Sequence, residues 1–351
     1  MTAASVRSSL PVLARSTLSR ATLRWPAYVL AATILVWPIV SQLPTRVRYA
    51  PFLVSVVVFG LPHGAVDHLV PARLAGVRRR RSYAVVGGVY AVLMAGYLLV
   101  WLVAPVVGFV SFILLTWYHW GQGDVYALAA IGGVGSLSGR LDRWLSIIVR
   151  GGLPMLVPLL SHPDEYRAVA TAIVSLFAAD ASGTLGVVFT PDTRLVAAIA
   201  FAGVTIASLA LGLYRVRQDR LNARAWRRDV LEVGLLWAYF WVLPPIFAIG
   251  VYFAVWHAVR HIGRLAAIDD RSLTALTAGE LRAPVGRFAR DAAPLTAASL
   301  LVFVGLFVGL SVGIDPDSLL AVYLVGIALL TLPHVAVVTW MDRRQLGTGA
   351  G

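Results

Sequence analysis

The chain has 351 residues, of which 59% are hydrophobic and only 13% are charged, whereas a soluble domain is usually about one quarter charged. Its formal net charge of +13 comes entirely from arginine, because the sequence holds no lysine, and this excludes a protein that binds retinal through a lysine Schiff base. It also holds no cysteine, which excludes disulfides, thiolate metal sites and thiol catalysis.

Apolar runs near the length of a membrane span recur along the whole chain, and about 20 such residues cross the hydrocarbon core of a bilayer. The sequence therefore predicts an all-α, polytopic transmembrane helix bundle of about ten spans, within a range of eight to ten. In chain order these spans are 26–43, 50–72, 82–104, 107–127, 144–161, 195–214, 229–247, 249–267, 292–313 and 318–341.

The remaining segments are short or polar. We expect residues 1–25 to form a basic cytoplasmic tail, residues 26–342 a single transmembrane domain, and residues 343–351 a short C-terminal tail. Residues 162–193 form a longer loop that contains a short amphipathic stretch, roughly 165–179. His162 lies in this loop and is expected to be a turn residue.

The arginines test this topology, because the cytoplasmic loops of membrane proteins carry an excess of basic residues. With the N-terminus inside, 26 of the 30 basic residues fall on inner segments, and the outer segments carry only Arg46, Arg48, Arg167 and Arg194. Both termini are therefore expected in the cytoplasm, with the protein crossing the plasma membrane several times and contacting its lipids. The arginines do not form one stripe, so no nucleic-acid partner is expected.

Six of the seven histidines lie inside predicted spans. An ionisable side chain in the bilayer costs free energy, so a functional role is the first hypothesis for it. They form four clusters, with the sequences GLPHGAVDH at 60–68, WYHWGQGD at 117–124, WHAVRH at 256–261 and LPH at 332–334. Each cluster lies on a span that runs from outside to inside. Parallel helices that carry histidines at similar depth can meet at one point, as they do in the metal sites of helical bundles.

The spacing within the clusters supports a shared site. His257 and His261 are four residues apart and therefore share one helical face. Asp67 shares a face with His63, and its carboxylate could accept the spare ring N–H of a ligating histidine. Arg260 lies about 100° further round the helix than His261. We expect it to contact backbone carbonyls or Asp124, or to extend toward the inner membrane surface.

Neutral imidazoles without a thiolate suit iron, zinc, copper or nickel. Zinc hydrolysis usually places a glutamate beside a ligating histidine, as in the sequence HExxH. The three glutamates, Glu165, Glu232 and Glu280, do not adjoin any histidine, so intramembrane zinc proteolysis is not expected. A redox metal in an apolar cavity lined by aromatic residues favours an apolar substrate and oxygen chemistry.

The stretches GLPHGAVDH, WYHWGQGD, FAVWHAVRH and LPHVAVVTWMD, in this order and at these spacings, resemble the bacteriorhodopsin-related (Brp/Blh) family of membrane β-carotene 15,15'-dioxygenases. The resemblance covers roughly residues 50–342. It implies that domain 26–342 is catalytic and cleaves β-carotene at its central 15,15' double bond with O2, giving two all-trans-retinal molecules at a non-haem Fe(2+). The product would be handed to a rhodopsin.

The resemblance also implies roles for individual residues. Matched by motif, the residues that hold the iron and carry catalysis are His63, His119, His257 and His261. The residues expected to support these ligands, or to replace one of them, are His334, Asp67, Asp124 and His68. A lipid-facing tunnel is expected for the long substrate, and its candidate lining residues are Trp117, Tyr118, Trp120, Tyr252, Phe253 and Trp256.

Other functions remain open from the residues alone. A membrane hydroxylase or desaturase of carotenoids or lipids would hold two metal ions and needs repeated HxxxH or HxxHH groups, of which this chain has a single HxxxH. A transporter or proton pathway would use the histidines as relays and bind no metal. A non-catalytic assembly factor for a rhodopsin would form no product.

Overall fold

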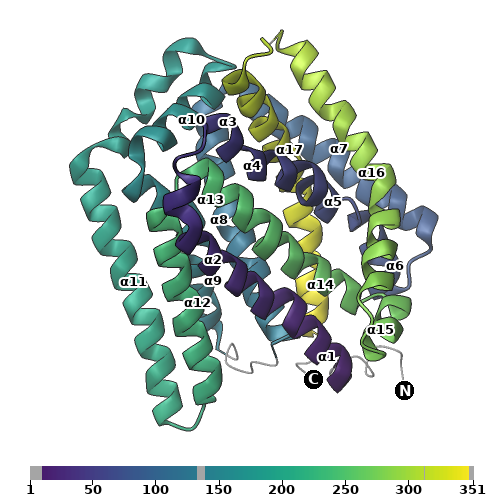
Figure 1. Ribbon diagram of the computed structural model, residues 1–351. Helices are drawn as coiled ribbons and strands as arrows, with labels where there is room; N and C mark the ends of the chain where they lie inside the picture. Colours follow the sequence, from purple (N-terminus) through teal and green to yellow (C-terminus); the bar gives the residue numbers. More distant parts are fainter. Residues whose placement is uncertain (1–9, 133–138, 312, 348–351) are drawn as a thin grey trace.

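All the secondary structure in the described residues of the computed structural model, 10–132, 139–311 and 313–347, is helical (Figure 1). Seven of the helical segments in these ranges are long and apolar enough to cross a membrane, and they are Val12–Val40, Arg79–Val103, Arg140–Ser161, Pro191–Arg217, Pro245–Ala267, Arg282–Gly309 and Ser318–Gln345. This confirms the prediction of an all-α, polytopic helix bundle. Residues 1–9 of the predicted N-terminal tail and 348–351 of the C-terminal tail lie outside the described residues.

The N-terminal part consists of short elements around one long helix. Its elements are α1 (Val12–Ser19), η1 (Arg20–Arg24), α2 (Trp25–Val40), α3 (Thr45–Arg48), α4 (Ala50–Val54), η2 (Ser55–Gly60), α5 (Leu61–Gly64), η3 (Asp67–Leu69) and α6 (Val70–Ala75).

Longer helices make up the rest of the bundle. The middle of the chain forms α7 (Arg79–Val103), α8 (Pro105–Ala130), α9 (Arg140–Ser161), α10 (Pro163–Ser175), η5 (Ala179–Phe189) and α11 (Pro191–Arg217). The C-terminal part forms α12 (Ala223–Val242), α13 (Pro245–Tyr252), η6 (Phe253–Ala258), α14 (Val259–Ala267), α15 (Asp270–Thr277), α16 (Arg282–Gly309) and α17 (Pro316–Gly347).

Helical segments lie at all ten predicted spans, but three of them are not among the seven apolar spans. Helices α8 and α12 carry polar and charged side chains along part of their length. The predicted span 50–72 is broken into α4, η2, α5, η3 and α6. Pro51, Pro62 and Pro71 lie within this region, and a proline lacks the N–H that a continuous helix needs.

The first helix begins earlier than its predicted limit at residue 26. Elements α1 and η1 lead directly into α2, so the helical segment starts at Val12. Ala14, Leu18 and Leu23 are buried and pack with Leu128 and Leu276 in one apolar cluster. Part of the predicted tail is therefore packed against the bundle.

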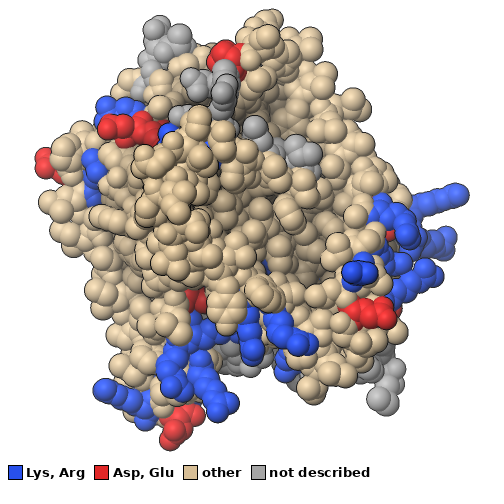
Figure 2. All heavy atoms as spheres, in the orientation of Figure 1, with Lys and Arg blue, Asp and Glu red and all other residues tan. Residues whose placement is uncertain are grey.

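The segments differ in how much protein surrounds them. Most of Arg140–Ser161, Pro245–Ala267 and Ser318–Gln345 is buried within the protein, whereas little of Pro191–Arg217 or Arg282–Gly309 is buried. Figure 1 shows α11 and α16 at opposite sides of the bundle. Figure 2 shows basic side chains gathered along the lower edge and the right-hand side of one face, below a broad uncharged band. The cytoplasmic location of both termini remains a prediction.

Helices α8 and α9 approach closely at two glycines. A Cβ atom on Gly121 would collide with the backbone carbonyl of Ile147, and one on Gly151 would collide with that of Trp117. Because the obstacles are backbone atoms, the side-chain-free glycines are what permits this contact.

Replacing Gly151 with valine should therefore force α8 and α9 apart. We expect a loss of stability of about 1–3 kcal/mol or more, the usual cost of overpacking. Thermal unfolding followed by size-exclusion chromatography in detergent measures this loss. Gly88→Val on α7 is the control, because a Cβ there meets nothing within 4 Å, and equal stability of the two variants would contradict the prediction.

Candidate metal centre

Five histidines from five helical elements meet inside the bundle. They are His63 on α5, His119 on α8, His257 on η6, His261 on α14 and His334 on α17. The ring centroids of His334 lie 4.8 Å from those of His63 and His119 and 5.1 Å from that of His261. The ring of His257 lies 4.9 Å from that of His119 and 5.6 Å from that of His63. The structure thus brings together all four predicted ligands and His334.

Two π-helical turns shape this meeting point. His257 lies within η6, and His63 follows η2 by three residues. Such turns are rare and occur frequently at functional sites. The two turns pack against each other, and Gly60 makes this possible because a Cβ there would lie 2.7 Å from the ring of Phe253. The ring of Phe253 in turn stacks on His257 at 5.6 Å.

Most of the imidazole nitrogens in the cluster are buried and have no hydrogen-bond partner. This holds for both ring nitrogens of His119 and of His261, and for Nε2 of His257 and His334. A buried polar atom without a partner costs about 1–3 kcal/mol. A bound cation would satisfy several of these nitrogens together.

Distances within the cluster fit metal coordination. Ligand atoms of His63, His119 and His257 lie within 4.8 Å of one another, and so do those of Asp67, His261 and His334. The two groups adjoin through the close ring contacts of His334. The donor set is rich in imidazole and contains no thiolate, which suits iron, zinc, copper or nickel.

Asp67 holds His334 rather than a ligand on its own segment. His334 Nδ1 lies 2.7 Å from Asp67 Oδ2, and the Tyr90 hydroxyl donates to the same oxygen at 2.7 Å. A carboxylate in this position fixes the tautomer and the orientation of a ligating ring. Tyr90 could not be predicted from the sequence, because it comes from α7, a helix without a histidine.

The remaining contacts separate His63 from His68. Nδ1 of His63 contacts the carbonyl oxygen of Gly60, which leaves Nε2 for the cluster. Nδ1 of His68 lies 2.9 Å from the carbonyl oxygen of Ala65, and its ring lies 4.7 Å from that of Tyr83. The structure therefore places His68 beside α7 and outside the group of five rings.

Asp124 lies in a buried ionic network on the other side of η6. It accepts hydrogen bonds from Arg150 Nη1 and Arg260 Nη1 at 2.5 Å each, and from Trp256 Nε1 at 2.8 Å. Glu232 lies 3.0 Å from Arg150 and 3.2 Å from Arg260. The guanidinium of Arg260 also lies over the Trp256 ring at 3.8 Å. The sequence left three alternatives open for the Arg260 side chain, and the structure shows its contact with Asp124.

This network ties the segment that carries His257 and His261 to α8, α9 and α12. Arg150 and Glu232 were not among the predicted site residues. The sequence could have indicated them, because each is a charged residue inside a predicted span. Arg150 lies in span 144–161 and Glu232 in span 229–247. Such residues mark functional or structural ion pairs at membrane depth.

An apolar cavity of about 590 Å³ borders the histidines, and His63, His119 and His334 form part of its wall. Small-molecule sites usually have volumes of about 300–1,000 Å³. Of the predicted tunnel residues, Trp120 and Phe253 line this cavity. Further lining residues come from α7, α10 and α16, which the sequence did not single out.

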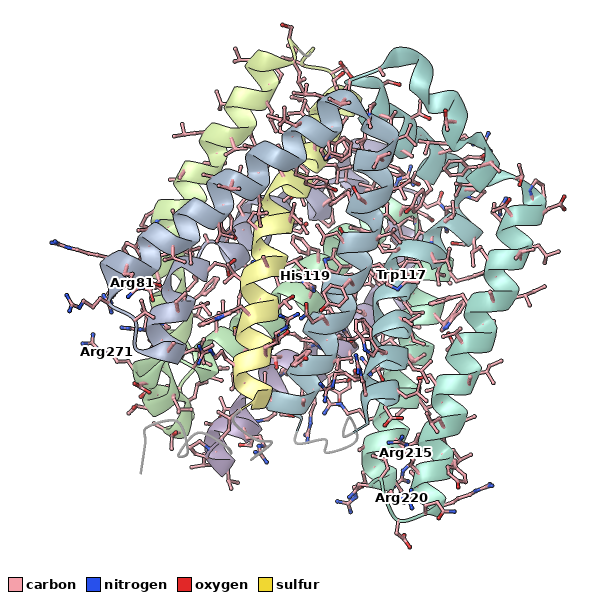
Figure 3. All side chains as sticks on the ribbon, turned by 180° about the vertical axis from the view of Figure 1, so that it is seen from behind. Arg81, Trp117, His119, Arg215, Arg220 and Arg271 are labelled. Atoms are coloured by element: carbon pink, nitrogen blue, oxygen red, sulfur yellow. The ribbon has the colours of Figure 1, made fainter. Side chains whose placement is uncertain are left out.

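The other four predicted tunnel residues are not part of the cavity wall, and they are Trp117, Tyr118, Tyr252 and Trp256. They serve helix packing instead. Trp117, labelled in Figure 3, donates to the Ile148 carbonyl of α9 at 2.8 Å, and the Tyr118 ring also faces α9. Tyr252 is fully buried between neighbouring aromatic rings, and Trp256 is bonded to Asp124.

Comparison with known proteins identifies the family of this chain. The family model of β-carotene 15,15'-dioxygenase matches residues 54–342. A probable β-carotene 15,15'-dioxygenase, Blh, from Halobacterium salinarum is 47% identical over 344 residues, which are 96% of each chain. The probable β-carotene 15,15'-dioxygenase Brp of the same species is 30% identical over 318 residues, 86% of each chain.

A more distant relative is the β-carotene 15,15'-dioxygenase of an uncultured marine bacterium. It is 22% identical over 295 residues, which are 83% of this chain and 93% of that one. No solved structure matched the chain. The family model covers most of the chain and Blh is 47% identical over nearly its whole length, so the chain belongs to the β-carotene 15,15'-dioxygenase family.

Proposed function

We propose that this protein cleaves β-carotene at its central 15,15' double bond with molecular oxygen and forms two molecules of all-trans-retinal. The double bond breaks and each of its carbons takes one oxygen atom, so one O2 balances one carotene. The observation that carries this proposal is the convergence of five histidines, four of them buried and His63 partly buried, beside an apolar cavity. The names of the relatives supply the identity of the bond.

The cofactor that we propose is a ferrous ion held by His63, His119, His257 and His261. The buried, unpartnered nitrogens of His119, His257 and His261 and the absence of thiolate donors support a metal of this kind. Zinc satisfies similar donors but has no redox chemistry. When bound, iron would supply the activation of oxygen, for which the side chains here offer no equivalent.

His334 is a further ligand in this proposal. It lies among the other four rings, and its Nε2 is buried without a partner. Its Nδ1 is engaged by Asp67, which receives a second hydrogen bond from Tyr90. This arrangement is the usual second contact of a metal-ligating histidine.

The cavity would hold the polyene against the histidines and keep water away from it. His63, His119 and His334 border the cavity, whereas His257 and His261 do not. The substrate would therefore lie on the side of the first three rings. Steric contact with apolar and aromatic side chains would orient it, since a hydrocarbon offers no hydrogen bonds.

The cellular setting follows from the apolar helices and the substrate. A multi-pass protein can take β-carotene directly from the lipids around it, and we place this one in the plasma membrane. Retinal, which is also apolar, could pass to a rhodopsin in the same membrane. Two adjoining groups of ligand atoms keep a two-metal oxygenase as the second candidate function.

Expression in a carotene-producing bacterial host tests the reaction. The orange cells should lose their colour and accumulate retinal, measured by chromatography. His257→Ala and His261→Ala should each reduce retinal by at least about 100-fold, the scale of loss when a metal site is damaged. The purified variants should also contain less iron. His162→Ala is the matched control, because His162 lies outside the cluster and should keep full activity.

Metal content separates the two candidate functions. One iron per chain is expected for the dioxygenase, whereas two per chain and a hydroxylated carotenoid would favour the other oxygenase. Persistent colour in cells with folded, iron-loaded protein would refute carotene cleavage.

The contact between Asp67 and His334 predicts a graded effect on metal affinity. Asp67→Asn should weaken metal binding by about 10–100-fold, the usual effect of losing such a carboxylate. Tyr90→Phe removes one of the two hydrogen bonds to Asp67 and should have a smaller effect. Anaerobic titration with Co(II), followed by its visible absorption, measures affinity without turnover. Wild-type affinity in both Asp67→Asn and His334→Ala would remove His334 from the ligand set.

A further inference from the structure

The two ends of the apolar cavity differ in how they are closed. At one end the wall comes from α4, α10 and α13, where Phe52 and Ile246 are 6% and 7% exposed and pack together in one apolar cluster. Ala170 and Ile173 of α10 add further buried wall residues. Among the described residues, no lining residue of these three helices is exposed, and we call this end of the cavity the closed arm.

The other end lies between α7 and α16. Tyr83 and Gly87 on α7, and Leu295 and Ala298 on α16, line the cavity and are also exposed on the outside of the protein. Tyr83 is 46% exposed and Leu295 is 38% exposed. The cavity is not fully enclosed, and its exposed lining residues in the described chain all lie on these two helices, so the cavity meets the surface here.

Packing between the helices explains the opening. Both α7 and α16 pack on α17, but in the described chain they make little direct contact with each other. Figure 1 shows both on the same side of the bundle, with α17 between them and the centre. Residues of α17 including Ile327, Leu330 and His334 form the floor of the cavity here. The opening therefore leads directly to the histidines.

The chemistry of the rim indicates what passes through it. Tyr83 packs its ring against His68, whereas the other rim residues are small or apolar, and Gly87 has open space where a Cβ would lie. The span Arg282–Gly309, which contains α16, is apolar and little buried, so this rim would face hydrocarbon. An apolar molecule that passes sideways from the bilayer through this rim never has to enter water.

We infer that the opening between α7 and α16 is a lateral portal through which the carotenoid moves from the bilayer into the cavity, with the closed arm receiving the end that enters first. This inference rests on the proposed function. It adds a determinant of regiochemistry, because the length of the closed arm sets which double bond comes to rest beside His63, His119 and His334.

The absence of cysteine from the chain permits a reversible test of the portal. Gly87→Cys and Ala298→Cys place a thiol on the rim, whereas Gly88→Cys and Ala297→Cys place one on the next residue. Gly88 and Ala297 are also exposed but do not line the cavity. Each variant is treated with benzyl methanethiosulfonate, assayed, and assayed again after dithiothreitol, so that each unmodified variant is its own reference.

Modification of the two rim variants should slow β-carotene turnover by at least about 10-fold, because a benzyl group fills an apolar passage. Dithiothreitol should restore the rate, and bound iron should not change. The two neighbouring variants should change less than about twofold, since an adduct that points into lipid obstructs nothing. Equal inhibition, or none, in all four modified variants would overturn the portal.

A second readout separates this inference from the proposed reaction. The rate of β-carotene loading is followed without oxygen by tryptophan quenching in the same variants. If the wild type loads carotene but does not cleave it, the proposed function fails while the portal is still tested. If the adducts at Gly87 and Ala298 leave loading unchanged, the portal fails while cleavage can still stand.

The closed arm has its own test. Ile249 of α13 also lines the cavity and packs against Phe52 and Ile246. Phe52→Ala and Ile249→Ala should each lengthen this arm and let the substrate enter further, so that aldehydes of unequal length appear beside retinal on chromatography. Phe201→Ala on α11 is the control, because Phe201 is buried but does not line the cavity, and it should yield retinal alone. Retinal as the sole product of both closed-arm variants would show that the arm does not set the cleavage position.

Discussion

A buried imidazole nitrogen needs a partner, and this requirement governs the centre of the molecule. Six such nitrogens, on His119, His257, His261 and His334, lie inside the bundle without a hydrogen bond from the protein. Desolvation of this many polar atoms opposes folding, so the surrounding structure must hold the rings together against that cost. A shared cation would relieve much of this cost, because one ion can accept a lone pair from one nitrogen of each ring. The helices that carry the rings are accordingly held by buried polar contacts, with Asp67 bonded to His334 on one side and Asp124 bonded to Arg150 and Arg260 on the other.

One of these contacts is the ionic network around Asp124. His257 and His261 face the histidine cluster, whereas Trp256 and Arg260 on the same segment face Asp124 and Glu232. The segment therefore presents one side to the cluster and the other to a set of charges that are almost completely buried. Breaking such a pair by removing one partner costs about 3–5 kcal/mol, because the remaining charge stays buried. The network thus fixes the rotation of the helix that carries two of the proposed ligands.

The sequence was sufficient for the fold class, because the apolar runs are a local property. The convergence of four particular histidines was predicted from the spacing of the motifs together with the resemblance to a known family. The sequence could not decide whether His334 is a ligand or only supports the ligands. Its orientation depends on the contact with Asp67, which is 267 residues away in the chain. Nor could it separate aromatic residues that pack helices, such as Trp117 and Tyr252, from those that line the cavity, such as Trp120. Both kinds occur at the same depth in similar helices, and only their rotation about the helix axis differs. The broken segment 50–75 was missed for another reason, since its prolines are individually compatible with membrane helices.

The difference between the two ends of the cavity gains meaning from the symmetry of the proposed substrate. β-Carotene has two identical halves, so either end can enter the closed arm first and the same central bond comes to rest beside the histidines. A single closed arm is then sufficient to define the position of cleavage, and the opposite end of the substrate can extend toward the opening between α7 and α16. A carotenoid with unlike ends would lose this property, because its two modes of insertion would place different neighbouring groups against Phe52 and Ile246. The shape of the closed arm would therefore favour a symmetric substrate. No polar group has to recognise the polyene directly.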